Sequence, residues 1–421
     1  MNNAFKPADI LVPKSGTDMK LWSVVACDQY TSEPEYWNEV YSAVGTNPST
    51  LNLILPEIYL EDNDVDKRIE KIHGEMKKYL ANGIFDEYKD SVIYIERVQS
   101  NGIVRAGIIG KIDLEEYDIS KGSTSQVRAT EATVIERIPP RIKVRNGAEL
   151  ELPHIMVLID DEDKTVIEPL FANKNKFRKI YDFSLMQGGG SVSGFVVDKE
   201  SQKNILSSLE KLGDAECFNK KYSLNDTPVL LYAMGDGNHS LATAKQYYQN
   251  LKAANPDKDM SSHPARYALV EIVNLHSNAL CFEAIHRIVK NVDVDKLIAE
   301  MNEKLEITSQ PQQQSFRYYI GGVEKTAYIG KPSSNLTVGS LQTFLDSYLK
   351  ENGGDIDYIH GEDTVKAIAD KCNGIGFILP DMNKNQLFPT VIKDGALPRK
   401  TFSMGHAADK RFYIEARKIT E

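Results

Sequence analysis

The residues best suited to chemistry lie in one short turn, the sequence Gly-Asp-Gly-Asn-His-Ser at positions 235–240. The apolar run 229–234 before it predicts a buried strand, and the residues after it have the composition of a helix. A strand, a tight turn and a helix start leave backbone N–H groups and the positive end of a helix dipole available to an anion. Asp236, His239 and Ser240 add a carboxylate, an imidazole and a hydroxyl. The turn therefore predicts a site for phosphate chemistry.

The composition of this turn also fits an ordinary structural turn, because Asp, Gly, Asn and Ser are common in turns and helix caps. Gly237 is the expected left-handed residue, and Asn238 or Ser240 could cap the helix. Turn chemistry alone does not explain His239. The predicted catalytic residues here are Asp236 and His239, and the predicted phosphate ligands are Gly235, Gly237, Asn238 and Ser240.

A second group of charged residues lies between positions 128 and 141. Arginine binds phosphate oxygens bidentately, and a carboxylate can accept a hydroxyl proton. The pattern predicts a helix over 130–138 that Pro139 and Pro140 end, with Arg128 and Glu131 on one face. A solvated helix with surface salt bridges would give the same pattern. The candidates from this segment are Glu131 as a catalytic base and Arg128, Arg137 and Arg141 as phosphate ligands.

Three further residues are candidates at the ends of apolar segments or in basic clusters. Asp28 follows the strand-like run 22–26, where a catalytic carboxylate or a simple turn residue would both fit. Arg287 follows an apolar segment, and Lys400 belongs to a late basic cluster that extends to Lys410. Both are predicted phosphate ligands, with packing or surface charge as the alternative explanation.

The overall composition excludes several classes of function. The 421 residues predict two or three domains, and 60 acidic against 50 basic side chains give a net charge of −10. Such a chain is a poor binder of nucleic acid or of membrane surfaces. No apolar run approaches the roughly 18 residues of a spanning helix, and the N-terminus has no apolar signal region. The four cysteines are far apart, which predicts reduced thiols, no structural zinc and a cytoplasmic location.

The order of elements predicts an α+β fold with a mixed sheet, because helices and strands alternate without the regular rhythm of a doubly wound fold. A hairpin is expected from 91–98 and 103–112, joined through Asn101-Gly102. The expected domains are a core over residues 1–290, an appended smaller α/β unit over 291–350 and a C-terminal segment over 351–421. This last segment would return to the core through strands at 374–379 and 411–417.

Several sequence motifs, spread over almost the whole chain, resemble one known family. They are CDQYTSEPEYW, LPEIYLED, RATEATVIERIPPR, LPHIMVLIDD, MQGGG, GDGNHSLATAK, AIHR and LPRKTFSMG. In this order they resemble the bacterial family of unknown function designated DUF1015. The family resemblance is the basis for treating these motifs as parts of one protein type.

The turn is also similar to the Asp-Gly-His-His-Arg signature of the ParB/sulfiredoxin-like superfamily, whose members bind nucleotides or phosphate and include a free-serine kinase. Asp236, Gly237 and His239 match that signature. Asn238 replaces its first histidine and Ser240 its arginine. The resemblance implies a ParB/sulfiredoxin-like core, in which phosphate would be held by backbone N–H groups and by arginines from elsewhere in the chain.

Together these features predict a small-molecule phosphotransferase. It would use Mg²⁺ with a nucleotide or pyrophosphate and act on serine or a related hydroxyl metabolite. The alternatives are a non-catalytic regulator that binds a nucleotide or metabolite, and a phosphatase acting on the same compound. Nucleic acid and membranes are not expected partners, and the sequence leaves the oligomeric state open.

Overall fold

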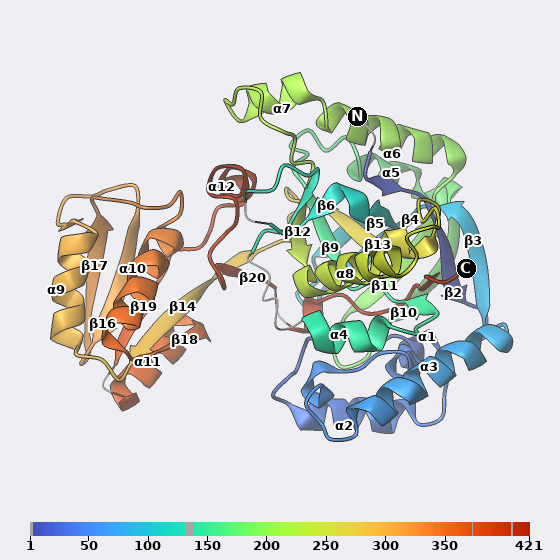
Figure 1. Cartoon of the computed structure of the whole chain (residues 1–421), viewed down its shortest axis with the longest axis horizontal. Coiled ribbons are helices and arrows are strands. Elements are labelled where there is room, and N and C mark those ends of the chain that lie inside the picture. Colours follow the sequence, from blue (N-terminus) through green and yellow to red (C-terminus); the bar gives the residue numbers. More distant parts are fainter. Residues whose placement is uncertain (1–2, 121, 132–137, 373, 406) are drawn as a thin grey trace. The chain divides into compact units, whose positions relative to one another are not determined.

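The computed structural model describes residues 3–120, 122–131, 138–372, 374–405 and 407–421. These residues form two compact units (Figure 1). The larger unit consists of Met1–Ala129, Thr133–Leu280 and His406–Glu421, and the smaller one of Thr130–Ala132 and Cys281–Gly405. Because the chain enters the smaller unit and then returns, the last residues of the chain belong to the larger unit.

The larger unit is built on a ten-stranded mixed sheet with the order β10-β11-β4-β5-β13-β9-β12-β7-β6, in which β1 also pairs with β5. The strands are β1 (Phe5–Lys6), β4 (Ile93–Val98), β5 (Val104–Asp113), β6 (Tyr117–Asp118), β7 (Val127–Arg128), β9 (Met156–Ile159), β10 (Arg178–Ser184), β11 (Ser191–Val196), β12 (Tyr232–Asp236) and β13 (Tyr267–Asn274). The β13–β9, β12–β7 and β7–β6 pairs are parallel, and the other pairs are antiparallel. The prediction of a mixed sheet is confirmed.

Two smaller ribbons complete the strands of this unit. β2 (Ala8–Pro13) pairs with β3 (Phe85–Ser91), and β8 (Leu150–Glu151) pairs with β21 (Arg417–Lys418) near the C-terminus. The predicted hairpin is present as the antiparallel pair of β4 and β5, with the Asn-Gly sequence in its connection.

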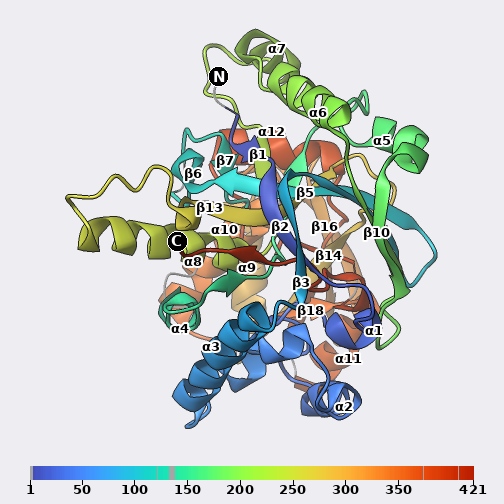
Figure 2. The same ribbon diagram turned by 90° about the vertical axis from the view of Figure 1, so that its right-hand side faces the viewer.

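The helices of the larger unit are α1 (Met19–Trp22), α2 (Pro34–Val44), α3 (Val65–Ala81), α4 (Ile138–Arg145), α5 (Glu168–Asn173), α6 (Lys199–Leu212), α7 (Ala215–Lys221) and α8 (Asn238–Ala254). In both ribbon views α2 and α3 lie at one end of this unit and α6 and α7 at the other (Figures 1 and 2). Helix α2 shows why such segments fold as they do. Its Trp37, Val40 and Val44 recur at three- and four-residue spacing and are buried in the core cluster.

The segment around the two prolines differs from its prediction. Thr130 and Glu131 are not helical, and α4 begins at Ile138 and includes both Pro139 and Pro140. Proline is compatible with a first helical turn, because N–H groups there have no partner within the helix. The expected helical face shared by Arg128 and Glu131 is therefore wrong, since Arg128 lies in strand β7.

The smaller unit contains a seven-stranded antiparallel sheet with the order β15-β17-β16-β19-β14-β18, in which β20 also pairs with β14. The strands are β14 (Phe282–Lys290), β15 (Ile307–Thr308), β16 (Ser315–Ile320), β17 (Val323–Ile329), β18 (Asp355–His360), β19 (Ile375–Ile378) and β20 (Phe402–Met404). The helices are α9 (Val294–Lys304), α10 (Thr337–Asn352), α11 (Glu362–Cys372) and α12 (Leu387–Asp394).

The division into units differs from the sequence-based boundaries at both ends of the smaller unit. Strand β14, which was predicted to end the core, pairs with β18, β19 and β20 and so belongs to the smaller unit. The predicted strand at 374–379 is present as β19, and it pairs with β14 and β16 rather than with the larger sheet. Of the predicted C-terminal segment, only residues 406–421 lie in the larger unit.

A buried cluster of charges fixes that final segment to the larger sheet. Arg411 on the segment contacts two carboxylates: Nη1 lies 2.5 Å from Oε2 of Glu271 on β13, and Nη2 lies 2.7 Å from Oε2 of Glu415. Nε of Arg105 on β5 lies 3.4 Å from Oε1 of Glu271, and Arg97 on β4 donates to the carbonyls of residues 408 and 410. These five side chains are 0% to 4% exposed. Buried charges without partners would be very costly, so the cluster holds the segment in one position.

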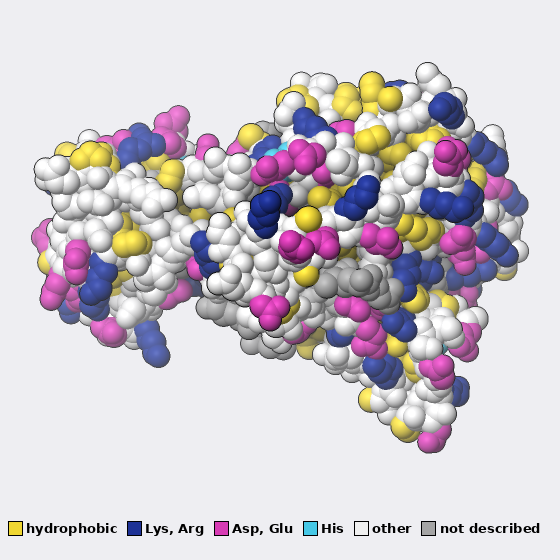
Figure 3. Space-filling model, turned by 90° about the horizontal axis from the view of Figure 1, so that it is seen from above, with side chains coloured by type: hydrophobic (Ala, Val, Ile, Leu, Met, Phe, Trp, Pro, Cys, Tyr) yellow, Lys and Arg dark blue, Asp and Glu magenta, His cyan; other side chains and the backbone are white. Residues whose placement is uncertain are grey.

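The surface carries charges of both signs. On the face shown in Figure 3, acidic and basic side chains are interspersed among the coloured residues rather than gathered in a single basic stripe. Among the described residues, no helix has both the length and the apolar character that crossing a bilayer requires.

Replacing Arg411 by Ala should lower the free energy of unfolding of the larger unit by about 3–5 kcal/mol, because Glu271 and Glu415 would stay buried without their partner. Urea unfolding followed by tryptophan fluorescence measures this unit, since both tryptophans of the chain, Trp22 and Trp37, lie in it. The control is Lys179→Ala, which removes an exposed ion pair with Asp182 and should cost less than about 1 kcal/mol. An equal, small loss in both variants would contradict a structural role for the cluster.

Candidate active site

The turn between β12 and α8 requires a glycine at its centre. Gly237 has φ +77° and ψ 28°, a left-handed conformation, and a Cβ atom there would lie 3.0 Å from Cα of Ile155. Gly235 and Asp236 end strand β12, and Asn238, His239 and Ser240 form the first turn of the 17-residue helix α8. Gly237 has no side chain to cap that helix, so its first turn keeps backbone N–H groups directed at the end of the strand.

Asp236 forms an ion pair with the C-terminal segment. Its Oδ2 lies 3.1 Å from Nζ of Lys410, and its Oδ1 accepts a hydrogen bond from the N–H of Gly237 at 2.9 Å. Burial opposes ionisation of this carboxyl group, but Lys410, His154 and the Gly237 amide outweigh it and lower its pKa. A carboxylate and an ammonium group therefore stand together at the positive end of α8.

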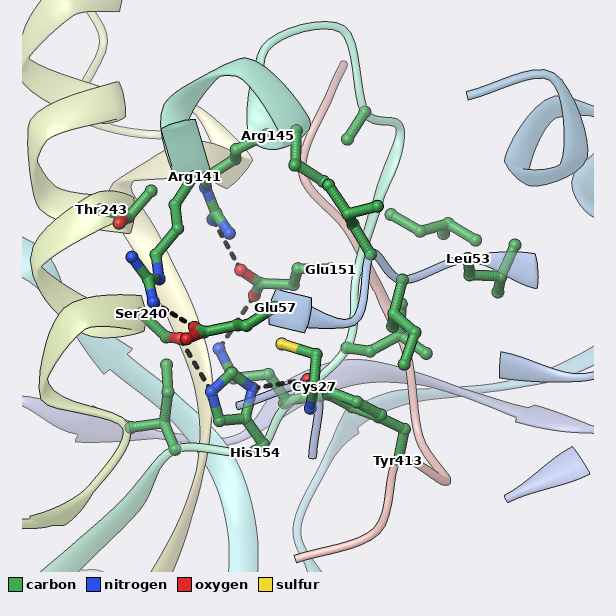
Figure 4. A pocket seen from close by; sticks show the side chains of 18 of the residues that line it. Cys27, Leu53, Glu57, Arg141, Arg145, Glu151, His154, Ser240, Thr243 and Tyr413 are labelled. Carbon is green, nitrogen blue, oxygen red and sulfur yellow. Dashed lines mark hydrogen bonds and ion pairs between the residues drawn. The ribbon is translucent and has the colours of Figure 1, made fainter. Parts of the chain in front are cut away.

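Ser240 begins a chain of hydrogen bonds that runs away from this ion pair (Figure 4). Its Oγ lies 2.8 Å from Nε2 of His154, and Nδ1 of His154 lies 2.9 Å from the hydroxyl of Tyr413. The Tyr413 hydroxyl also accepts a hydrogen bond from the backbone N–H of Cys27 at 3.1 Å. The chain thus links the helix start, the segment before β9, the C-terminal segment and the N-terminal region.

These side chains line a cavity of about 150 Å³ (Figure 4). Ser240, His154, Tyr413 and Cys27 form part of its wall. Two ion pairs form another part, namely Arg141 with Glu57 and Arg145 with Glu151. The remaining wall is mostly apolar and includes Leu53, Ile54, Leu55, Leu60, Met76, Val144, Ala148, Leu150, Leu152, Ile155 and Leu269. A small molecule with a polar end and an apolar body suits such a cavity.

Two other predicted residues of the larger unit have clear surroundings. Arg128 is buried and donates from Nε to the carbonyl of Ser125 at 2.7 Å and from Nη2 to that of Pro228 at 2.8 Å. Burial lowers its pKa to about 10. Asp28 is half-buried next to Cys27 and accepts a hydrogen bond from Nε2 of Gln29 at 3.1 Å.

Three predicted site residues belong to the smaller unit. Glu131 forms a β-bridge with Leu397. Arg287 on β14 is 0% exposed, and its guanidinium donates to Gln342 and to the carbonyls of residues 285 and 399. Lys400 is exposed at a backbone φ of +56°. A further predicted ligand, Arg137, lies outside the described residues.

Sequence reasoning missed His154 and Tyr413 as site residues. His154 was noted only as the start of a predicted strand, and a histidine beside Pro153 at the edge of an apolar run was its one available signal. Tyr413 had no signal, because it lies 259 residues from its histidine partner. Lys410 was visible as part of the late basic cluster, although its partner Asp236 was not.

The carboxylates near the turn can be tested for Mg²⁺ binding. Mg²⁺ bound with a nucleotide takes one or two protein carboxylates and completes its shell with phosphate oxygens and water, so Asp236 fits as a protein ligand. Among the described residues, Asp160, Glu162 and His276 also cluster as a possible metal site. There, Nζ of Lys221 already lies 3.0 Å from Oδ1 of Asp160, and an imidazole ligand suits transition metals better than Mg²⁺.

Replacing Asp236 by Asn should destabilise the larger unit at pH 7 and have a smaller effect in acid. The pKa of Asp236 lies below its usual value of 3.8, so the stability that its charge provides is present above that value and is lost as the pH falls through the lowered pKa. Urea unfolding of both proteins between pH 7 and pH 3 measures the difference. Asp182→Asn, at an exposed ion pair, serves as the control. A difference that grows in acid would contradict this assignment.

Comparison with solved structures finds weak overall similarity to three proteins. A conserved hypothetical protein from Pyrococcus furiosus is 12% identical with a TM-score of 0.36, over 74% of this chain and 94% of that one. A free serine kinase in complex with AMP is 12% identical with a TM-score of 0.37, over 74% and 90%. SbnI with a C-terminal truncation, from Staphylococcus aureus, is 10% identical with a TM-score of 0.36, over 73% and 82%.

Comparison with curated protein sequences gives no match. In contrast, residues 11–348 match the family described as "Protein of unknown function (DUF1015)". This match spans both structural units and includes the turn at 235–240. The family resemblance noted in the sequence is thereby confirmed, and the chain belongs to the DUF1015 family.

Proposed function

We propose that the larger unit transfers a phosphoryl group from a nucleotide or pyrophosphate to the hydroxyl of a small metabolite, with serine or a related compound as the first substrate to test. The observation that carries this proposal is the turn at Gly237. It sets the first-turn N–H groups of α8 beside the Asp236–Lys410 ion pair and next to the cavity that Ser240 lines. The similarity of the turn to the ParB/sulfiredoxin-like signature supports the same proposal.

The groups at this turn match what phosphoryl transfer demands, which is chiefly positioning and neutralisation of charge. Backbone N–H groups at a helix start and the ammonium of Lys410 can hold phosphate oxygens. Mg²⁺, when bound through Asp236, would neutralise charge on the transferred group. Asp28, beside Cys27 of the cavity wall, is the proposed acceptor of the hydroxyl proton, since Glu131 belongs to the smaller unit.

The direct test incubates the whole chain and Mg²⁺ with ATP, ADP or pyrophosphate and a panel of amino acids and hydroxy acids. Mass spectrometry should detect a phosphorylated acceptor together with the spent donor. Donor-dependent thermal stabilisation without consumption would instead favour a regulatory binding protein. Release of phosphate from a phosphorylated hydroxyl compound would favour a phosphatase. Absence of turnover and of stabilisation with every donor would contradict the proposal.

Replacing Lys410 by Gln should raise the Kd for the donor about 10-fold to 100-fold, because a charge-assisted hydrogen bond contributes about 1.5–3 kcal/mol. Isothermal titration calorimetry measures this change. Lys179→Gln is the matched control, since Lys179 also pairs with a single aspartate but lies exposed on β10, and its Kd should stay that of the parent. An unchanged Kd in Lys410→Gln would remove Lys410 from the proposed donor site.

A further inference from the structure

The hydrogen bonds of Tyr413 determine which atoms carry protons in the chain that ends at Ser240. A phenol has one hydrogen to donate and can accept hydrogen bonds on its oxygen. Burial raises the pKa of the Cys27 thiol, and a side-chain hydrogen bond from Tyr413 acts in the opposite sense, as a donor to sulfur does. The same bond raises the pKa of Tyr413, whose main cause is again burial. The single hydrogen of Tyr413 is therefore directed at Cys27 Sγ.

The remaining contacts of the Tyr413 hydroxyl must then be accepted bonds. One comes from the backbone N–H of Cys27 at 3.1 Å, and the other from His154, whose Nδ1 lies 2.9 Å away. Nδ1 of His154 consequently carries the proton, and in the neutral ring Nε2 holds a lone pair. Ser240 Oγ, 2.8 Å from Nε2, donates its hydrogen to that lone pair.

A serine that donates to a neutral histidine, itself oriented by a third group, has the arrangement of an activated nucleophile. His154 is 8% exposed and is held on both ring nitrogens, so the imidazole cannot turn away. Ser240 is half-buried and lines the cavity, where a ligand can reach it. It is also the third residue of α8, close to the positive end of the helix dipole.

We propose that Ser240 is the nucleophile of this site and carries the phosphoryl group as a phosphoserine intermediate between donor and acceptor. This inference rests on the proposed phosphotransferase function and specifies its path, which would have two steps instead of direct transfer. A phosphate on the third residue of a helix lies close to the backbone N–H groups and the dipole that stabilise negative charge. The helix start would thus favour the intermediate as well as the bound donor.

Each of the two steps balances. In the first, Ser240 Oγ forms a bond to the terminal phosphorus of the donor, the bond from that phosphorus to the bridging oxygen breaks, and the serine proton moves to Nε2 of His154. The nucleoside diphosphate, or phosphate from pyrophosphate, leaves. In the second, the substrate hydroxyl oxygen bonds to phosphorus, the Oγ–P bond breaks, and His154 returns its proton to Oγ. The substrate proton passes to Asp28 and then to solvent.

The test uses the whole chain with Mg²⁺ and a phosphoryl donor but no acceptor. Intact-protein mass spectrometry should show the addition of one phosphoryl group, and peptide sequencing should locate it on Ser240. Labelled ADP should exchange into ATP under the same conditions, because the first step is reversible without an acceptor. Ser240→Ala should lose the label and the exchange, and its turnover should fall about 100-fold or more.

Ser201→Ala is the matched control. Ser201 is also the third residue of its helix, α6, but its Oγ donates to Asp198 at 3.1 Å and not to a histidine. This variant should keep the label, the exchange and the turnover. Ser240→Cys keeps a nucleophile of similar size and should retain labelling in the form of a phosphothiol, which guards against a folding defect in the alanine variant. Localisation on the parent protein decides the question even where both variants misfold.

The outcomes separate this inference from the function on which it rests. Turnover with no phosphoserine, with no exchange and with full activity in Ser240→Ala would overturn the intermediate and leave the phosphotransferase intact. A label located on His239 or on another residue would also overturn it. No turnover and no donor binding by the parent protein would overturn both proposals.

Discussion

The site depends on the buried charges that fix residues 408–417 against the larger sheet. Arg411 contacts Glu271 and Glu415, while Arg97 and Arg105 donate to the backbone of the same segment. Each of these ions is stable in the interior only with its partners in place, so the segment has one favourable position. That position brings Lys410 to Asp236 and Tyr413 to His154, and neither contact would form if the segment were free.

The candidate site joins four parts of the chain that are remote in sequence. Backbone hydrogen bonds connect Tyr413 N–H to the Val24 carbonyl and Ala26 N–H to the Arg411 carbonyl, and the turn at Gly237 packs against Ile155. Charged and neutral polar groups consequently occupy separate sides of the helix start. The ion pair lies at the end of β12, and the neutral chain of serine, histidine and tyrosine enters the cavity. This separation allows one helix terminus to serve both binding of an anion and activation of a hydroxyl.

Local structure was largely predictable, because it depends on short-range patterns. The strand before the turn, the hairpin of β4 and β5 and the helices α2, α3 and α9 follow from apolar spacing, turn residues and acidic first turns. The prediction was wrong at α4, where two prolines begin a helix instead of ending one. The same error placed Arg128 and Glu131 on a common helix, although Arg128 holds backbone carbonyls in the larger unit and Glu131 bridges Leu397 in the smaller one.

The sequence by itself determined the turn at 235–240, since a glycine between a buried strand and a helix, surrounded by polar side chains, has few other uses. It also carried the family motifs. Only the tertiary structure decided which residues meet that turn, because ion pairs and hydrogen bonds between distant segments leave no periodic pattern in a single chain. His154, Tyr413 and the pairing of Lys410 with Asp236 became visible only once the sheet and the buried arginines had brought them together.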